Sequence, residues 1–159
     1  MDASAAITLI SAPSVVVNGR VPVTQQGEPR IGFLPLVDNV DVVACRRTVR
    51  QIAASLGFSI TGQTMLMTAA SELARNTLIH GGGGQFSWEV ISAGSRRGLR
   101  LIFEDHGPGI SDIRSAMTDG WTSGKGLGLG LPGAKRLSQE FEIQSRPGLG
   151  TRVVVARWQ

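Results

Sequence analysis

Apolar positions recur with two different periods along the chain, and the change of period separates a helical part from a strand part. From Asp41 to Leu56 most apolar residues fall on one broad face at helical spacing, although Arg46 interrupts that face. Gly57 suits the position that follows a helix. A second helix is predicted from about residue 61 or 63 to residue 80, where a run of four glycines ends it.

After this glycine run the pattern becomes that of short strands bounded by turns. A turn through Gly94 and Gly98 is predicted to join the first adjacent pair. Pro35 cannot donate a ladder hydrogen bond, so the strand that contains it is predicted at a sheet edge. The predicted strands cover residues 33–36, 85–91, 99–104, 141–145 and 151–158.

Two further helices are predicted within the strand-rich part. One is short, with Ser111 as its N-cap and Gly120 at its end, and the other runs through residues 134–138 after beginning between residues 129 and 133. Helices first and several adjacent strands afterwards predict an α+β fold. In that fold, helices cover one face of a mixed, mainly antiparallel sheet.

Residues 1–30 differ from the rest of the chain. VVVNGRVPV is compatible with a hairpin that turns at Asn18-Gly19, but the following TQQGEPR has the composition of a linker. We therefore expect an N-terminal extension at residues 1–30, loosely attached to one domain at residues 31–159.

Composition and charge favour a globular cytoplasmic protein. The chain has 159 residues, 42% of them hydrophobic and 18% charged, with a net charge of +4. Because the basic residues are scattered, we do not expect nucleic-acid binding. The lone Cys45 forms no disulfide within the chain and is expected to be buried. No apolar run approaches the roughly 20 residues of a membrane span, and the N-terminus lacks the basic start of a secretory signal.

The stretch GKGLGLGLPG, residues 124–133, raises the question of a phosphate site. It fails the P-loop pattern because Gly126 follows Lys125 where serine or threonine is needed. It contains GxGxxG, but a polar turn precedes it instead of a strand. An anion-binding nest of bare backbone N–H groups, assisted by Lys125, is favoured over a flexible linker or a closely packed strand of small residues.

Three polar residues of the second predicted helix, Glu72, Asn76 and His80, share one side at the margin of an apolar face. A carboxylate and a carboxamide one turn apart suit a hard cation or an activated water or hydroxyl. For this helix taken alone, a solvated edge with a weak ion pair between Glu72 and Arg75 is favoured over such a site.

Asp105 follows an apolar strand in FEDHGPGI, beside a glycine-rich gap. Its carboxylate can accept a hydrogen bond from a ligand amine, or it can form an ordinary Asx-turn. His80 and His106 are too few for a metal cluster, and no nucleophile-elbow GxSxG pattern favours covalent catalysis.

Together these stretches resemble the GHKL ATPase/kinase superfamily. ELARN, residues 72–76, is similar to its N box, DHGPG, residues 105–109, to its DxGxG box, GLGLG, residues 126–130, to its second glycine box, and Gly150-Thr151 to its closing GT. The similarity covers about residues 36–158. Within the superfamily, SELARN, EDHGPGISDI and GLGLGLPGAKRL are most similar to the RsbT-type switch kinases of bacterial partner-switching systems.

The resemblance implies a Bergerat-type two-layer α/β sandwich that binds ATP and Mg2+. Glu72 would be the catalytic carboxylate and Asn76 the Mg2+ ligand. Asp105 would accept from the adenine amino group with the support of Thr151. The resemblance also implies contacts to the base by Gly107 and Gly109, and contacts to the phosphates by Gly126, Leu127, Gly128 and Gly130. From its charge alone, Lys125 is expected to contact a phosphate too.

The resemblance also implies a function. It is that of a serine/threonine kinase that phosphorylates a STAS-domain antagonist protein and regulates a PPM-type phosphatase or a sigma-factor pathway. A direct anti-sigma factor and a non-catalytic, ATP-controlled binding module remain alternatives. His106 stands where the superfamily often has Asn or another polar residue, and residues 1–30 have no counterpart in it.

Overall fold

The computed structural model describes residues 31–118 and 130–159. The predicted extension at residues 1–30 and most of the glycine-rich stretch therefore lie outside the described residues. The elements in chain order are β1 (Ile31–Leu36), α1 (Asn39–Ser55), α2 (Ile60–Ile79), β2 (Gly84–Ala93), β3 (Arg96–Asp105), α3 (Ile113–Ala116), α4 (Gly130–Arg136), β4 (Glu140–Arg146) and β5 (Gly150–Trp158).

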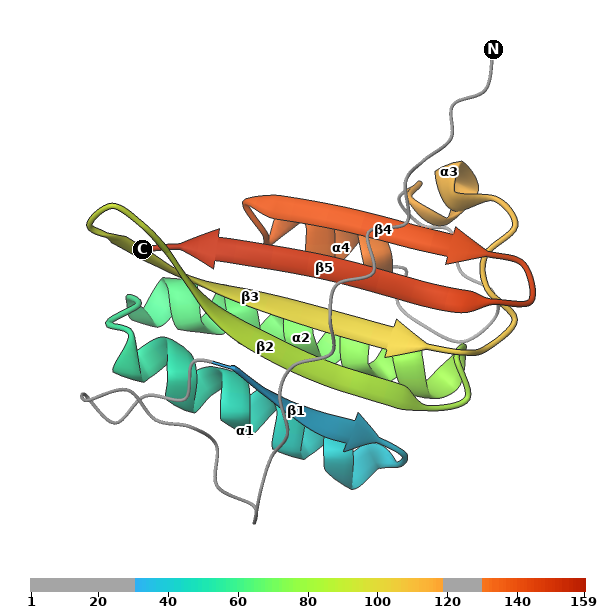
Figure 1. Cartoon of the computed structure of the whole chain (residues 1–159), viewed down its shortest axis with the longest axis horizontal. Helices are drawn as coiled ribbons and strands as arrows, with labels where there is room; N and C mark the ends of the chain where they lie inside the picture. The colour runs from blue at the N-terminus through green and yellow to red at the C-terminus, as the bar shows by residue number, and fades with distance from the viewer. Residues whose placement is uncertain (1–30, 119–129) are drawn as a thin grey trace.

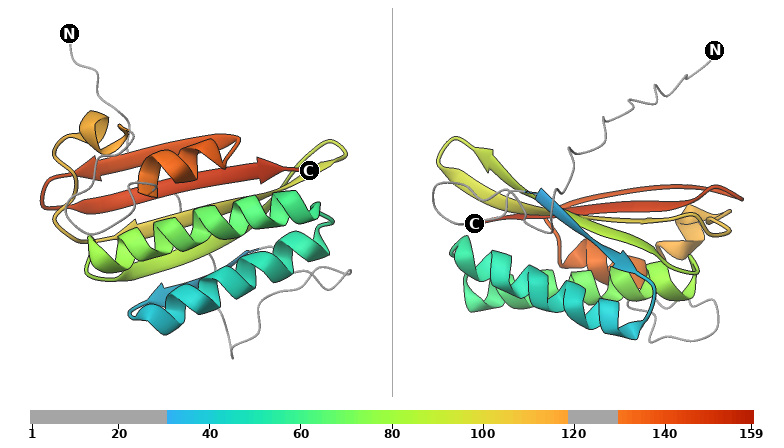
Figure 2. Two further views of the ribbon diagram at one scale, coloured as in Figure 1. Left: turned by 180° about the vertical axis from the view of Figure 1, so that it is seen from behind. Right: turned by 60° about the horizontal axis from the view of Figure 1, so that its bottom comes forward.

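The described strands form one sheet in the order β1-β2-β3-β5-β4. Helices α1, α2 and α4 lie on one face of it, so the molecule has two layers (Figures 1 and 2). The predicted α+β sandwich is confirmed, with one difference: every described strand pairing is antiparallel, so this sheet is not mixed. The strand that contains Pro35 lies at the sheet edge, as predicted.

The core lies between the sheet and α1 and α2. Successive side chains of a strand point to opposite faces, so Phe86, Leu101, Phe103 and Val155 reach inward together across three neighbouring strands. The rings of Phe86 and Phe103 stack with centroids 5.0 Å apart. Against them pack the small and branched residues of α2, which are Leu66, Ala69, Ala70 and Leu73.

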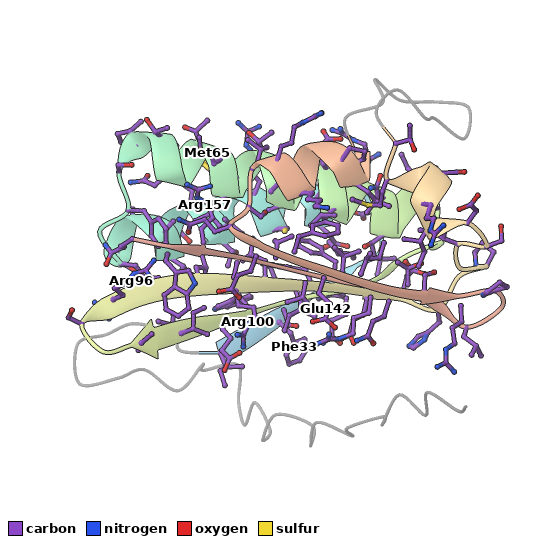
Figure 3. The ribbon with its side chains drawn as sticks, turned by 90° about the horizontal axis from the view of Figure 1, so that it is seen from above. Phe33, Met65, Arg96, Arg100, Glu142 and Arg157 are labelled. Atoms are coloured by element: carbon purple, nitrogen blue, oxygen red, sulfur yellow. The ribbon has the colours of Figure 1, made fainter. Side chains whose placement is uncertain are left out.

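The other face of the sheet carries both charged and apolar side chains. Phe33, Arg100 and Glu142 project from this face, away from the helices, whereas Arg157 lies on the helix side (Figure 3). Arg100 pairs with Glu89 across β2 and β3 at 2.9 Å. This exposed cross-strand pair adds little to the free energy of unfolding. The sheet is therefore stabilised mainly by the apolar side chains on its inner face.

Helix boundaries follow capping residues that the apolar pattern does not include. Asp38 caps α1 in a capping box with Asp41, so the helix begins at Asn39 rather than at the predicted Asp41. Asp112, and not the predicted Ser111, caps α3: its carboxylate accepts from the N–H of Ser115 at 3.0 Å and from the Ser115 hydroxyl at 2.7 Å. The hydrogen bonds from Ser115 lower the pKa of the Asp112 carboxyl.

Three glycine and cysteine predictions can be compared with the structure. Gly57 follows the C-cap of α1 at a φ of +84°, as predicted. The turn between β2 and β3 uses Gly94 at a φ of +61°, whereas Gly98 lies within β3 under the ring of Trp158 and is not a turn residue. Cys45 is buried in α1, as predicted, and this burial raises the pKa of its thiol far above the ordinary value. Its thiol therefore stays neutral and behaves as a small apolar group.

Candidate functional site

Asp105 stands at the end of β3, opposite the first residues of β5. It faces Thr151 in the strand register. Its Oδ1 accepts the backbone N–H of Gly107 at 3.0 Å and that of Thr151 at 3.2 Å. Both bonds fall on one oxygen, so among the described residues Oδ2 has no donor and can accept one from a ligand.

Glycines let three chain segments approach this carboxylate. A Cβ on Gly81 would overlap the Asp105 side chain, and a Cβ on Gly107 would come within 2.7 Å of the Gly81 backbone. Gly150 has a φ of +92° and lies against the Asp105 carbonyl. The loop after α2, the end of β3 and the turn before β5 therefore converge on Asp105.

Replacing Gly81 by Ala is expected to displace the carboxylate of Asp105, although Gly81 itself lies outside the motifs that contact the nucleotide. The new methyl group would overlap Asp105 and come within 2.6 Å of the Thr77 carbonyl oxygen. Such overpacking lowers the free energy of unfolding by about 1–3 kcal/mol, measurable as a lower urea midpoint. Gly82→Ala is the control for a neighbouring glycine that does not touch Asp105: its methyl group would meet open space, although the φ of +73° at this position itself disfavours alanine. Equal effects of both variants on nucleotide affinity would contradict a specific contact of Gly81 with Asp105.

The segment after Asp105 is tied to the turn between β4 and β5. The Ser145 hydroxyl accepts the N–H of Ile110 at 2.8 Å and lies 2.8 Å from the Thr151 hydroxyl. Gly109, at a φ of +70°, packs against the Arg146 carbonyl. Backbone packing therefore requires glycine at positions 107 and 109, in addition to the predicted approach of these residues to a base. The role of Ser145 was not predicted, because it depends on the strand register.

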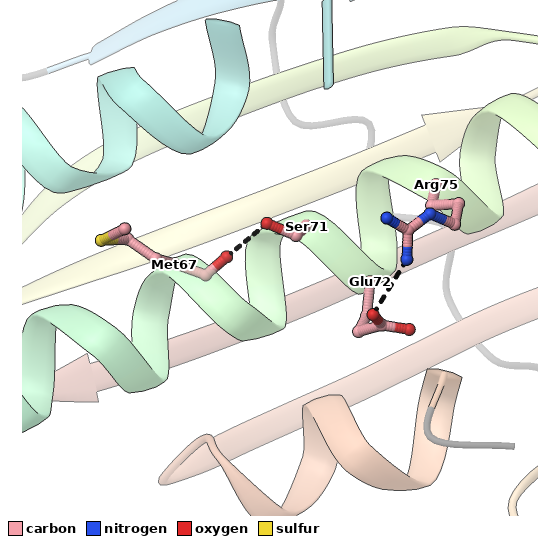
Figure 4. A network of polar contacts seen from close by, with 4 residues as sticks. All are labelled: Met67, Ser71, Glu72 and Arg75. Atoms are coloured by element: carbon pink, nitrogen blue, oxygen red, sulfur yellow. Dashed lines mark hydrogen bonds and ion pairs between the residues drawn. The ribbon is translucent and has the colours of Figure 1, made fainter. Parts of the chain in front are cut away.

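Glu72 and Asn76 lie on the side of α2 nearest α4. Figure 4 shows the Glu72 side chain extending toward α4, with its Oε1 held 3.1 Å from Nη1 of Arg75. A Cβ on Gly130 would lie 3.2 Å from Nδ2 of Asn76, so the amide faces the first residue of α4 directly. The N box therefore meets the end of the glycine-rich stretch in space, as a triphosphate site requires.

Not every predicted site residue can be placed. Lys125, Gly126, Leu127 and Gly128 lie outside the described residues. The helix that follows them begins at Gly130, within the predicted interval. His80 caps α2 and is exposed, and His106 is also exposed. Among residues 31–118 and 130–159, no three His, Cys, Asp or Glu side chains are grouped to hold a metal ion.

Residues 61–159 match the family model of the histidine kinase-, DNA gyrase B- and HSP90-like ATPases. The chain belongs to this family. The match covers α2, the sheet from β2 to β5 and every predicted site residue, so the converging loops around Asp105 and the N box lie within a recognised ATPase domain. This confirms the GHKL resemblance of the sequence.

Two curated members of the family show where the chain is similar. It is 46% identical over 118 residues to the serine/threonine-protein kinase RsbT of Bacillus subtilis, which covers 74% of this chain and 89% of that kinase. It is 34% identical over 117 residues to the anti-sigma F factor of Shouchella clausii, covering 70% and 80% of the two chains. The predicted likeness to partner-switching kinases of the RsbT type is therefore confirmed.

A solved structure supports the fold. The crystal structure of the RsbU and RsbW domains of a Mycobacterium tuberculosis protein matches with a TM-score of 0.53 and 19% identity. The match covers 80% of this chain and 31% of that longer chain. Among the described residues, no helix is long and apolar enough to cross a membrane.

Proposed function

We propose that this protein is an ATP-dependent serine/threonine protein kinase of a bacterial partner-switching system, with a STAS-domain antagonist protein as its substrate. The observation that carries the proposal is the 46% identity to RsbT over 89% of that kinase. The positions of Glu72, Asn76 and Asp105 support it as well. All three lie within the ATPase-family match, Asn76 faces the end of the glycine-rich stretch, and Asp105 is held by Thr151.

The side chains of Asp105 and Asn76 have the chemistry needed to bind ATP and Mg2+. Oδ2 of Asp105 would accept from the adenine amino group, while Thr151 holds Oδ1 through its N–H. Asn76 would hold Mg2+ through its side-chain oxygen. Mg2+ takes few protein ligands and completes its shell with phosphates and water, so a single amide facing Gly130 suits it. Lys125, Gly126, Leu127, Gly128 and Gly130 are proposed as the phosphate contacts.

Glu72 would act on the phosphate acceptor. Its carboxylate would accept a hydrogen bond from the substrate hydroxyl and orient the oxygen for attack, and positioning supplies most of the catalysis in phosphoryl transfer. When bound, Mg-ATP supplies the phosphoryl group and a metal that neutralises developing charge. The half-buried position of Glu72 beside α4 suits this role, because the carboxylate extends toward α4 and is still reachable from solvent.

Transfer to the antagonist would change which partner the kinase holds. A phosphate adds about −1.5 to −2 charges to the substrate surface, which weakens docking wherever the kinase offers carboxylates or apolar contacts. The released kinase would then engage a second partner, such as a PPM-type phosphatase or a sigma factor.

A direct transfer assay tests the proposal. The purified chain is incubated with γ-labelled ATP, Mg2+ and each STAS-domain protein of its source organism, and the labelled residue is identified by mass spectrometry. We expect stoichiometric label on one serine or threonine of a single STAS protein. Nucleotide binding without transfer to any STAS protein would contradict kinase function and favour an ATP-controlled binding module.

A direct anti-sigma factor is the second candidate, because the chain is also 34% identical to an anti-sigma F factor. This candidate predicts a stable complex with a sigma factor, whereas a switch kinase predicts a complex with a phosphatase after transfer. Affinity capture with purified sigma factors and phosphatases, with and without ATP, separates the two.

A further inference from the structure

The carboxylate of Glu72 is already engaged. Nη1 of Arg75 lies 3.1 Å from its Oε1, one turn further along α2 (Figure 4). The nearby Ser71 hydroxyl does not compete for this carboxylate, because it donates to the Met67 carbonyl at 2.8 Å. A guanidinium on a carboxylate neutralises its charge and occupies a lone pair that an acceptor hydroxyl would need.

The ion pair is asymmetric in its exposure. The Arg75 side chain is 54% exposed, whereas that of Glu72 is 25% exposed. Arg75 can therefore be reached by a docking protein while it still contacts Glu72. An exposed pair at this spacing is weak, so a competing carboxylate on another protein is able to break it.

We propose that Arg75 is a positioning residue that holds Glu72 inactive until the protein substrate docks, and that an acidic group on this substrate draws Arg75 away. The inference rests on the proposed kinase function, and it adds control by the substrate. This arrangement would keep ATP hydrolysis slow while no protein substrate is docked. In that reaction the oxygen of a water bonds to the γ-phosphorus, the bond from that phosphorus to the leaving ADP oxygen breaks, and Glu72 receives the water proton.

The first experiment measures ATP hydrolysis by the full chain without any protein substrate. Because exposed ion pairs are weak, Arg75→Ala is expected to raise the hydrolysis rate about 2- to 5-fold over the unmodified protein. Arg75→Lys keeps the positive charge and is expected to hold the rate near its original value. Arg50→Ala, which removes an exposed arginine of α1, is the matched control. A rate in Arg75→Ala that is unchanged or lower would overturn the proposal.

A second variant shows whether the raised hydrolysis rate of Arg75→Ala depends on Glu72. Glu72→Gln combined with Arg75→Ala is expected to lose the added hydrolysis, and a double variant that keeps it would overturn the proposal. If Arg75 instead binds the γ-phosphate, Arg75→Ala would weaken ATP binding and lower the rate, which also overturns it. A protein that binds no ATP at all would refute the proposed function, an outcome distinct from either of these.

Poly-L-glutamate serves as a probe for the acidic trigger. It is expected to raise hydrolysis by the unmodified protein and to leave the already raised rate of Arg75→Ala unchanged. No stimulation of the unmodified protein, or equal stimulation of both proteins, would overturn the assignment of an acidic group as the trigger.

Discussion

Replacement of Glu72 by Ala is expected to abolish phosphate transfer to the protein substrate while nucleotide binding persists. A positioned base contributes about 10²- to 10⁴-fold to a proton-coupled step, and the transfer rate should fall by that amount. ATP affinity should change little, because Glu72 would contact the acceptor rather than the nucleotide. Single-turnover transfer of labelled phosphate and calorimetric titration of ATP measure the two quantities separately.

The control for this substitution is Glu89→Ala. Glu89 is also half-buried and paired with an arginine, but it lies in β2 on the outer face of the sheet, away from α2. It should leave transfer unchanged. Undiminished transfer in Glu72→Ala would remove Glu72 from the catalytic role, whereas loss of both transfer and ATP affinity would assign it to nucleotide binding.

Much of the fold could be predicted because its local signals agree. The period of apolar residues in α1 and α2, the proline at the edge strand and the glycine after α1 all point to the observed elements. The errors in the helix boundaries came from contacts of a few atoms. Asp38 and Asp112 cap their helices through side-chain hydrogen bonds that the apolar pattern does not contain.

The site could be predicted only in part, because its contacts join distant segments. Glu72 and Asn76 share a helix face, so spacing alone brings them together. The pairing of Asp105 with Thr151 joins residues 46 positions apart and depends on strand register. The packing of Gly81 against Asp105 and the hydroxyl network of Ser145 gave no signal in the sequence, because a single glycine or serine is compatible with many positions.

Replacement of Asp105 by Asn is expected to weaken ATP binding by about 10- to 100-fold, since hydrogen bonds to charged groups are the stronger ones. Asn keeps the shape of the side chain and an oxygen that can still accept the N–H groups of Gly107 and Thr151. These two donors fix the orientation of the amide, so its NH2 group would replace Oδ2. Direct titration with ATP measures the loss. Thermal unfolding should change little, because the bonds to Oδ1 survive.

The same variant should also change which base is preferred. At the position where adenine carries an amino donor, guanine carries a carbonyl acceptor, and the new NH2 group would repel the first and donate to the second. In Asp105→Asn the affinity for GTP should therefore rise relative to the affinity for ATP, as measured by competition between the two nucleotides. Glu104→Gln is the matched control, because Glu104 immediately precedes Asp105, points to the other face of the sheet and pairs with Arg152 at 3.1 Å. If both variants lost ATP affinity equally without a change in base preference, Asp105 would not be the residue that reads the base.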